Sequence, residues 1–359
     1  MKFIPHVMLS ALSLALIPQS DANASLFGSA PSKKQKPVVK QDGADDERSN
    51  ECMKGVTFYG DYLYMKAIQD GLKYAQLVPQ NSTITPISRS LEQKFDYNSG
   101  FRIGTSYSLP HKRWDLDLNW MSFNSSPNAV TAKSHNHGIL AAVALPVYAL
   151  TQNSLVNYVR GKWEMDLNTV ELDLQIHLSL GKKFTLTPLG GVKAGWVDQE
   201  VKVRYEDFLI VQPTANTPQR MKGHNNMWGV GPMIGIDARF ILPADFGIFF
   251  TWKVSALAGS FSLKSTYKDF LHTSSHAKLV LKSSERRLAM VQELQAGMNK
   301  IWSITRKGRV RSRIQIAAGW ETQIWSRQWR LNLFDTFIEP SDGADLTLYG
   351  LFARAGVSF

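Results

Sequence analysis

The sequence predicts an all-β fold: a transmembrane antiparallel β-barrel of about ten strands, with long external loops and both termini on the periplasmic side. Three observations lead to this prediction. Apolar and polar residues alternate over most of the chain, short connections alternate with long ones, and tryptophans gather near the ends of the apolar stretches. A membrane-spanning helix is not expected, because the longest apolar run of the barrel region, residues 139–150, is broken by Pro146 and is too short.

Residues 1–24 have the layout of an export signal. Lys2 gives a positive start, residues 7–17 are mostly apolar, and Ala22-Asn23-Ala24 offers the small residues that signal peptidase requires. We expect cleavage after Ala24 and no lipid anchor, since no cysteine stands directly after that position. Residues 25–55 are rich in Lys, Asp, Ser and Pro and predict a disordered periplasmic tail. The barrel is therefore expected over residues 56–359.

The alternation of apolar and polar residues is typical of strands that bury one face. Between residues 171 and 180, the residues Leu172, Leu174 and Ile176 alternate with polar neighbours, as the following residues do. The same pattern recurs in residues 97–109, 114–120, 184–196, 228–240, 246–258, 288–302, 310–320 and 349–359. A soluble sandwich would also show this alternation, so the choice of a membrane barrel depends on the other two observations.

The connections between these stretches differ in length in a regular way. Short connections at residues 110–113, 181–183, 242–245 and 305–309 alternate with long ones at residues 67–92, 124–161, 204–225, 262–284 and 326–344. Outer-membrane barrels have short periplasmic turns and long external loops. The pattern predicts ten strands, or twelve if residues 67–92 form a hairpin of their own.

Tryptophans at the strand ends predict two aromatic girdles at the lipid–water boundaries. Those assigned to the girdles are Trp114 and Trp302, beside short turns, and Trp163, Trp196, Trp228 and Trp320, toward the long loops. The chain ends on Phe359, and its last strand resembles the signal that the barrel-insertion machinery reads. These features place the protein in the bacterial outer membrane after export.

The first strand resembles a known family. Residues 58–67 read FYGDYLYMKA and are followed by QDGLKYA at residues 69–75. This block resembles the opening of the major-outer-membrane-protein-like pore formers of chlamydia-related and Legionella-type bacteria, whose members often carry Trp where this chain has Met65. The resemblance implies a porin-like pore and supplies no catalytic residues. Some relatives form intermolecular disulfide networks through many cysteines, whereas Cys52 is the only cysteine here.

The resemblance and the barrel pattern together predict a passive diffusion pore for small hydrophilic solutes or ions. The alternative is an occluded structural or adhesin-type barrel that binds partners through its external loops. The net charge of +11 favours anionic partners. Since an exported chain does not normally meet nucleic acid, we expect outer-membrane lipid and lipopolysaccharide as partners, together with the insertion machinery and self-association.

Charged residues on the polar parity of the strands are the candidate pore-lining residues. One predicted wall carries Asp115, Asp117, Glu171 and Asp173, and the opposite wall carries Arg309, Arg311, Arg313 and Arg354. Two interpretations stay open: a constriction that sorts solutes by charge, or a paired network that fills a narrow lumen. If the lumen is open, the four arginines predict a net positive constriction with a weak preference for anions.

Catalysis, cofactors and metals are not expected. The sequence has no Gly-x-Ser-x-Gly motif, and the external His224, His272 and His276 lack an obvious acidic partner facing a cleft. His135 and His137 lie two residues apart without a third ligand nearby, so we interpret them as solvated loop residues. His177 is expected to point into the lumen beside Asp173 as a hydrogen-bonded residue.

The apolar run at residues 139–150 falls in the second long loop. An exposed patch of this kind needs cover. We therefore expect it to fold into the barrel mouth or dock on neighbouring loops, with Val143 and Leu145 shielded from solvent.

Overall fold

The computed structural model describes residues 55–79, 89–109, 114–134, 137–141, 155–208, 218–268, 278–306, 309–329 and 344–359. The expected export signal, the N-terminal tail up to residue 54 and Cys52 lie outside these residues, as do Val143 and Leu145. Within the described ranges, no helix is long and apolar enough to cross a membrane.

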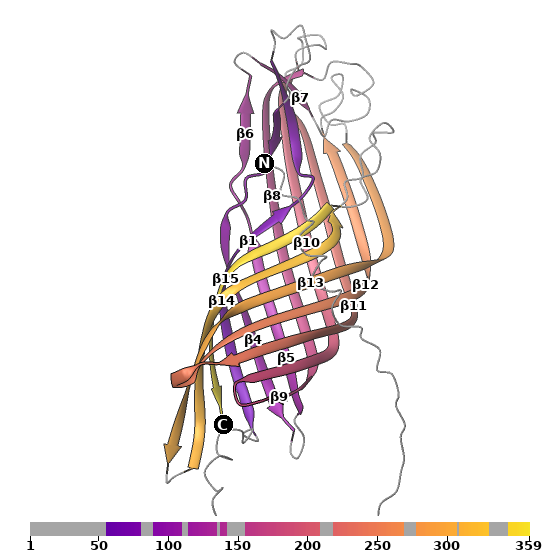
Figure 1. The fold of residues 1–359 in the computed structure, drawn as a ribbon. Helices are drawn as coiled ribbons and strands as arrows, with labels where there is room; N and C mark the ends of the chain where they lie inside the picture. The colour runs from indigo at the N-terminus through magenta and orange to yellow at the C-terminus, as the bar shows by residue number, and fades with distance from the viewer. Residues whose placement is uncertain are drawn as a thin grey trace, which may run out of the picture. The chain divides into compact units, whose positions relative to one another are not determined.

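Ten long strands form a closed antiparallel ring in the described part of the chain (Figure 1). Each pairs with the next in the chain, β8 pairs with β10, and β1 pairs with β15 to close the ring. The strands are β1 (Val56–Gln69), β4 (Tyr97–Ser108), β5 (Trp114–Ser125), β8 (Leu155–Ile176), β10 (Phe184–Phe208), β11 (Gln219–Ile241), β12 (Phe246–Lys268), β13 (Lys278–Arg306), β14 (Arg309–Trp329) and β15 (Ala344–Ser358). The predicted fold class, a transmembrane antiparallel barrel, is confirmed.

The connections reproduce the predicted alternation of lengths. At one end, β9 (Leu178–Leu180) continues β8 into a three-residue turn, and the 3₁₀ turn η1 (Pro243–Asp245) joins β11 to β12. The long connections after β1 and β5 contain β2 (Lys73–Pro79), β3 (Arg89–Glu92), β6 (Val130–Lys133) and β7 (His137–Ala141). Residues 67–92 thus do form a hairpin, β2–β3. This hairpin pairs with β7, and its strands are not part of the closed ring of ten.

Several strands are longer than a membrane requires. β8 and β10 to β13 have 22 to 29 residues each, whereas about 9–11 tilted residues span the hydrocarbon core. Residues 204–225 and 262–284, expected as loops, are therefore mostly strand. The expectation was wrong because apolar alternation was used to define the strands, and the added segments stand outside lipid, where outward-facing residues are polar.

A band of exposed apolar side chains surrounds the lower part of the ring. On its upper edge, Trp196 and Trp228 face each other on β10 and β11 and are 47% and 51% exposed. Trp120 and Trp320 are exposed on the same outer face, and Trp302 is exposed on β13 near the short turns, while Trp114 is half-buried. A wide exposed apolar surface with tryptophan at its borders is what a lipid-facing wall requires.

Trp163 departs from the predicted girdle. Its side chain is fully buried inside the barrel and donates a hydrogen bond from Nε1 to Oε1 of Gln199 at 3.1 Å. It shares the inward parity of β8 with Glu171 and Asp173. The prediction was wrong because the apolar parity inverts above the lipid-facing band: there the outer face meets water, and the apolar side chains fill the interior instead.

The β2–β3 hairpin covers the external mouth of the ring. Tyr74 on β2 is 1% exposed, and its ring lies over Gly161 on β8, where an added Cβ would come within 2.3 Å of the ring. Tyr205 on β10 donates a hydrogen bond to the carbonyl of Tyr74 at 2.7 Å. On neighbouring β7, Ile139 is fully buried. The cover of the mouth therefore comes from the first long connection as well as the second.

Candidate functional site

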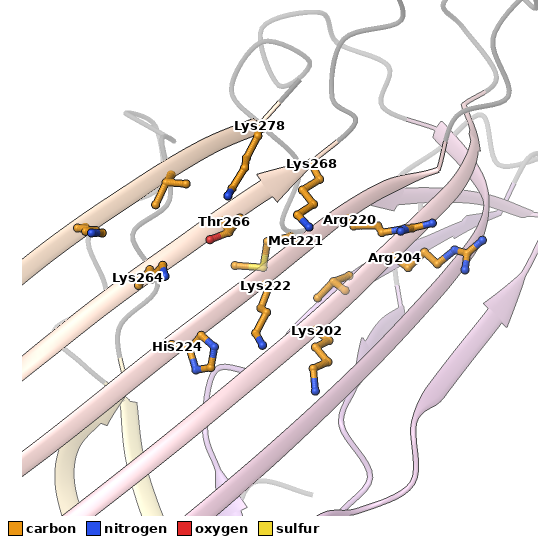
Figure 2. A pocket seen from close by; sticks show the side chains of 13 residues that line it. Lys202, Arg204, Arg220, Met221, Lys222, His224, Lys264, Thr266, Lys268 and Lys278 are labelled. Carbon is orange, nitrogen blue, oxygen red and sulfur yellow. The ribbon is translucent and has the colours of Figure 1, made fainter. Parts of the chain in front are cut away.

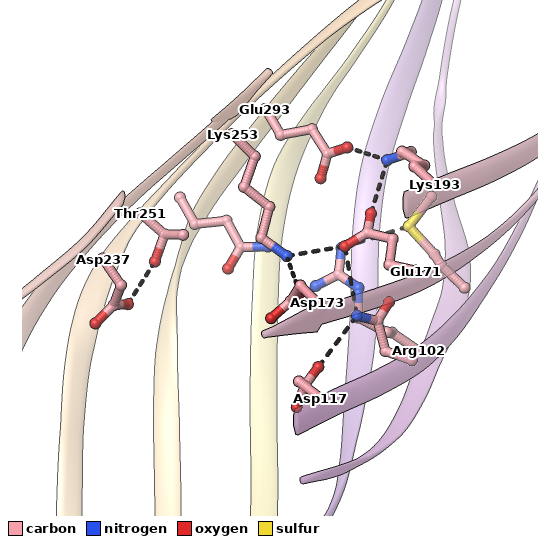
Figure 3. A network of polar contacts seen from close by, with 12 residues as sticks. Arg102, Asp117, Glu171, Asp173, Lys193, Asp237, Thr251, Lys253 and Glu293 are labelled. Carbon is pink, nitrogen blue, oxygen red and sulfur yellow. Dashed lines mark hydrogen bonds and ion pairs between the residues drawn. The ribbon is translucent and has the colours of Figure 1, made fainter. Parts of the chain in front are cut away.

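A layer of buried charges crosses the barrel interior about midway along the strands (Figure 3). Its first part gathers around Asp61 on β1. Arg354 on β15 donates to both oxygens of this carboxylate, at 2.7 Å from Nε and 2.8 Å from Nη2, and Arg102 on β4 donates to Oδ2 at 2.9 Å. The second Nη of Arg102 reaches Oε1 of Glu321 on β14 at 2.5 Å. These contacts connect four strands around the ring closure.

The second part of the layer gathers around Glu171 on β8. Lys193 on β10 donates to Oε1 at 2.7 Å, and Lys253 on β12 donates to Oε2 at 2.8 Å. Lys193 also pairs with Glu293 on β13, and Lys253 lies 3.4 Å from Oδ2 of Asp173. Lys193 is fully buried, and its ammonium lies 5.4 Å from the ring centroid of Trp325.

Burial makes this layer energetically unusual. Moving charges out of water costs several kcal/mol per ion, and apolar residues of similar volume are often at least as stabilising as a buried ion pair. Stability alone is thus a weak reason for such a layer. The ion-paired residues named above comprise four cations and five carboxylates. Asp117, also buried and held by the Tyr59 hydroxyl at 2.8 Å, adds a sixth acidic side chain.

A polar cavity opens below the layer, toward the short turns. Its volume is about 200 Å³. Asp115 lines it and contacts Nε2 of His177 at 2.8 Å, while Asp237 contacts Arg239 at 2.8 Å and Thr251 at 2.8 Å. Lys253 and Arg354 line the same cavity from the charged layer, so water at the periplasmic end reaches the buried charges.

Above the layer, the interior is filled by apolar side chains. The largest that are fully buried include Trp163, Trp325, Phe123 and Phe261. They belong to one apolar cluster that continues up to Tyr74 of the β2–β3 hairpin. The lumen is therefore polar in its periplasmic half and closed by apolar packing in its external half.

The predicted pore-lining residues divide into two groups. The structure places Asp115, Asp117, Glu171 and Asp173 on the inner face of β5 and β8, and Asp117 pairs in register with Asp173. His177 was expected beside Asp173 but contacts Asp115 and Thr187. The second group, the four predicted arginines, does not converge on the opposite wall.

Only Arg354 among those four arginines contacts the charged layer in the described structure. Arg313 pairs with Ser358, the last residue of β15, so Arg309 and Arg311 lie beyond the end of that neighbouring strand. Arg311 is exposed there. The predicted positive constriction was wrong because the β13–β14 hairpin extends past the ring, which strand parity alone does not reveal.

Six residues of the layer were missed by the sequence prediction. Each is an isolated charge on the inward parity of a strand that otherwise reads as apolar or glycine-rich: Asp61, Arg102, Lys193, Lys253, Glu293 and Glu321. The sequence feature that could have identified them is a single charge between lipid-facing apolar residues, such as Lys193 between Val192 and Ala194. A lone charge inside a membrane-spanning strand must face the interior.

A metal centre is not formed by the residues that the structure describes, since no group of three His, Cys, Asp or Glu side chains is suited to hold an ion. His135 lies outside the described residues, and only the backbone of His137 is described, in β7.

A closed antiparallel ring, an exposed apolar wall bordered by tryptophan and a charged interior define the class of bacterial outer-membrane β-barrels. The comparisons with known proteins narrow this class. The family model described as the Legionella pneumophila major outer membrane protein precursor matches residues 51–359. The chain belongs to this family, and the resemblance seen in its first strand is confirmed. No curated protein matches the chain.

The comparison with solved structures finds outer-membrane proteins at low similarity. The outer membrane protease OmpT from Escherichia coli is 10% identical, with a TM-score of 0.41 over 85% of this chain and 96% of that one. A major outer membrane protein from Thermus thermophilus is 11% identical, with a TM-score of 0.31 over 85% and 99%. A Pseudomonas aeruginosa FadL homologue is 8% identical, with a TM-score of 0.29 over 85% and 90%. Similarities this low carry no argument about function.

Proposed function

We propose that this barrel is a porin-like channel that lets small hydrophilic solutes or ions diffuse across the outer membrane. One observation supports the proposal above others: the charged layer faces the water-accessible polar cavity and spans the lumen where apolar packing would serve stability equally well. Charged rings at a constriction are how pores select ions. The proposal assigns no catalytic reaction to the chain.

Conduction requires that the external half of the lumen opens. The β2–β3 hairpin and the apolar side chains beneath it are the parts that must move, because the polar cavity ends at the charged layer. The layer itself has more carboxylates than cations, so we expect a preference for cations in the open state. This replaces the preference for anions that the sequence suggested.

The test is a recording of the refolded full chain in a planar bilayer under a salt gradient. The expected result is stepwise conductance with a reversal potential that favours cations. Removing two carboxylates of the layer, with Glu293→Gln and Glu321→Gln, should reduce that preference while leaving conductance in place. Asp245→Asn, on the exposed turn η1, is the control: it removes one negative charge outside the lumen and should leave the preference unchanged. Heat-modifiable mobility in gels confirms folding of each variant.

A second candidate function is an occluded structural or adhesin-type barrel. The apolar cluster that fills the external half of the lumen favours it. A variant in which residues 72–93 are replaced by a short Gly/Ser linker distinguishes the two. Conductance that is absent in the native chain and in this variant, with both correctly folded, contradicts the channel and leaves the occluded barrel.

A further inference from the structure

A row of five cations crosses the outer surface of the barrel above the lipid-facing band. Arg160 on β8 pairs in register with Arg204 on β10, and Arg204 pairs with Arg220 on β11. Arg220 pairs with Lys268 on β12, and Lys268 pairs with Lys278 on β13. All five side chains are exposed on the outward parity of their strands. Five neighbouring strands thus present a positive residue at the same register position.

Two further rows lie on the same face, closer to the membrane. The next contains Lys162, Lys202 and Lys222, and the one below it contains Glu164, Glu200, His224, Lys264 and Lys282. We name these three rows the basic wall. Its ten Lys and Arg side chains face only two carboxylates within the rows, and Figure 2 shows most of the cations around one shallow groove of about 870 Å³.

The two carboxylates of the basic wall are already engaged by lysines. Hydrogen bonds from Lys162 and Lys202, at 2.6 and 3.0 Å, hold the pKa of Glu164 at about 2. Glu200 lies 2.7 Å from Lys202 and 2.9 Å from Lys222, and these contacts lower its pKa below the usual range although burial opposes them. Both stay ionised near neutral pH and offset two of the three lysine charges of the middle row.

The remaining cations have no comparable neutralisation. Arg204 pairs with Glu206 at 2.5 Å. Arg160, Arg220, Lys264, Lys268, Lys278 and Lys282 form no ion pair with any carboxylate whose side chain the structure describes. Like charges directly opposite each other across paired strands are destabilising. An isolated barrel gains nothing from this arrangement, whereas a bound polyanion would neutralise it.

The position of the basic wall indicates which polyanion binds there. Trp196 and Trp228 mark the upper edge of the lipid-facing band, and Lys202 and Lys222 lie six residues further out on the same parity of the same strands. At roughly 3.3 Å per residue along tilted strands, the wall stands about 10–20 Å above the lipid boundary. In the outer leaflet, this height belongs to the head groups and core sugars of lipopolysaccharide.

We propose that the basic wall binds the phosphate-bearing head group of lipopolysaccharide molecules packed against the barrel. The acyl chains contact the exposed apolar band, and the anionic groups contact the cations directly above it. The groove between the strands gives room for phosphate and sugar groups among several Lys and Arg side chains, which form charge-assisted hydrogen bonds with phosphate oxygens. The contact is independent of the state of the lumen.

The test compares two triple variants of the refolded full chain in detergent micelles. The wall variant carries Arg220→Gln, Lys268→Gln and Lys278→Gln, all in the row of five. The control variant carries Lys73→Gln, Lys94→Gln and Lys133→Gln, three exposed lysines of the external region outside the wall, with the same loss of charge. Binding is measured with fluorescent lipopolysaccharide, in parallel with its dephosphorylated form and with heparin as a soluble polyanion.

The expected result is a loss of about tenfold or more in lipopolysaccharide affinity for the wall variant, since surface ion pairs each contribute a factor of a few. The control variant should stay within about twofold of the native chain. Dephosphorylated lipopolysaccharide should bind the native chain as weakly as phosphorylated lipopolysaccharide binds the wall variant. Lipopolysaccharide should also raise the melting temperature of the native chain more than that of the wall variant.

Two outcomes overturn the proposal. Equal lipopolysaccharide affinity of the wall and control variants would remove the basic wall from lipid binding. Wall-dependent binding of heparin without wall-dependent binding of lipopolysaccharide would instead indicate a soluble polyanion as the partner. Because the substituted residues are exposed cations, we expect the wall variant without lipid to be at least as stable as the native chain, which separates loss of binding from loss of folding.

Discussion

At the scale of single residues, the charged layer depends on side chains that hold several partners at once. Asp61 is the clearest case, since its two oxygens accept hydrogen bonds from both Arg102 and Arg354, and all three side chains are largely buried. Glu171 has the same role for Lys193 and Lys253. Removing such a carboxylate leaves two cations without their partner in largely buried surroundings, where only the side that faces the polar cavity meets water.

Asp61→Asn should therefore destabilise the barrel by about 3–5 kcal/mol, the cost typical of breaking a buried pair from one side. Glu164→Gln on the external surface is the matched change, and it should cost about 1 kcal/mol or less because its ion pairs are solvated. The measurement is the free energy of unfolding in urea with the barrel in lipid vesicles. Equal losses for the two variants would contradict the description of a buried layer.

At the scale of elements, the lower and upper parts of the strands follow opposite rules. In the lipid-facing band, apolar side chains point outward and charges point inward. Above it, charges point outward and apolar side chains pack inside, as in a water-soluble sheet. β8 shows both rules in one strand, with Leu172 exposed in the lower part and Trp163 buried in the upper part.

Brominated lipids quench tryptophans that contact acyl chains, which tests this inversion. Trp196→Phe combined with Trp228→Phe should remove part of the quenching of the refolded barrel, because both rings are exposed on the lipid-facing wall. Trp163→Phe should remove fluorescence without changing the quenched component. A loss of quenching with Trp163→Phe would mean that this ring faces lipid.

The position of the β2–β3 hairpin depends on one residue of β8, Gly161. Gly161→Ala should displace the Tyr74 ring and loosen the hairpin, because a Cβ has no room there. Ala75→Cys in a Cys52→Ser background reports the change, because position 75 is fully buried. The thiol of this cysteine should react slowly with a maleimide, and it should react faster when Gly161→Ala is added. Gly60→Ala is the control, since its Cβ meets nothing nearer than 3.9 Å. Unchanged labelling would show that Gly161 does not seat the hairpin.

At the scale of the whole barrel, the sequence predicted the architecture well and the interior only in part. Ten strands, the turn ends and the outward tryptophans other than Trp163 follow from period-two alternation, which each strand carries by itself. The layer of buried charges does not follow from this alternation, because its ion pairs join residues far apart in the sequence. Arg102 and Glu321 are 219 positions apart, and Lys193 and Glu293 are 100 apart. The misplaced arginines have the same origin, since the relative lengths of β14 and β15 depend on closure.

The seam between β1 and β15 also determines when the barrel is complete. Asp61 and Arg354 are separated by 293 positions, so β1 must wait for β15 before either strand has both of its neighbours. Until then, β1 and β14 each present an unpaired edge, which is a template for pairing with another chain. Neighbouring hairpins form from local contacts, but contacts of high sequence separation are slow to form. Assembly of this protein therefore ends with one joining step, in which a carboxylate from the start of the barrel meets a guanidinium from its end.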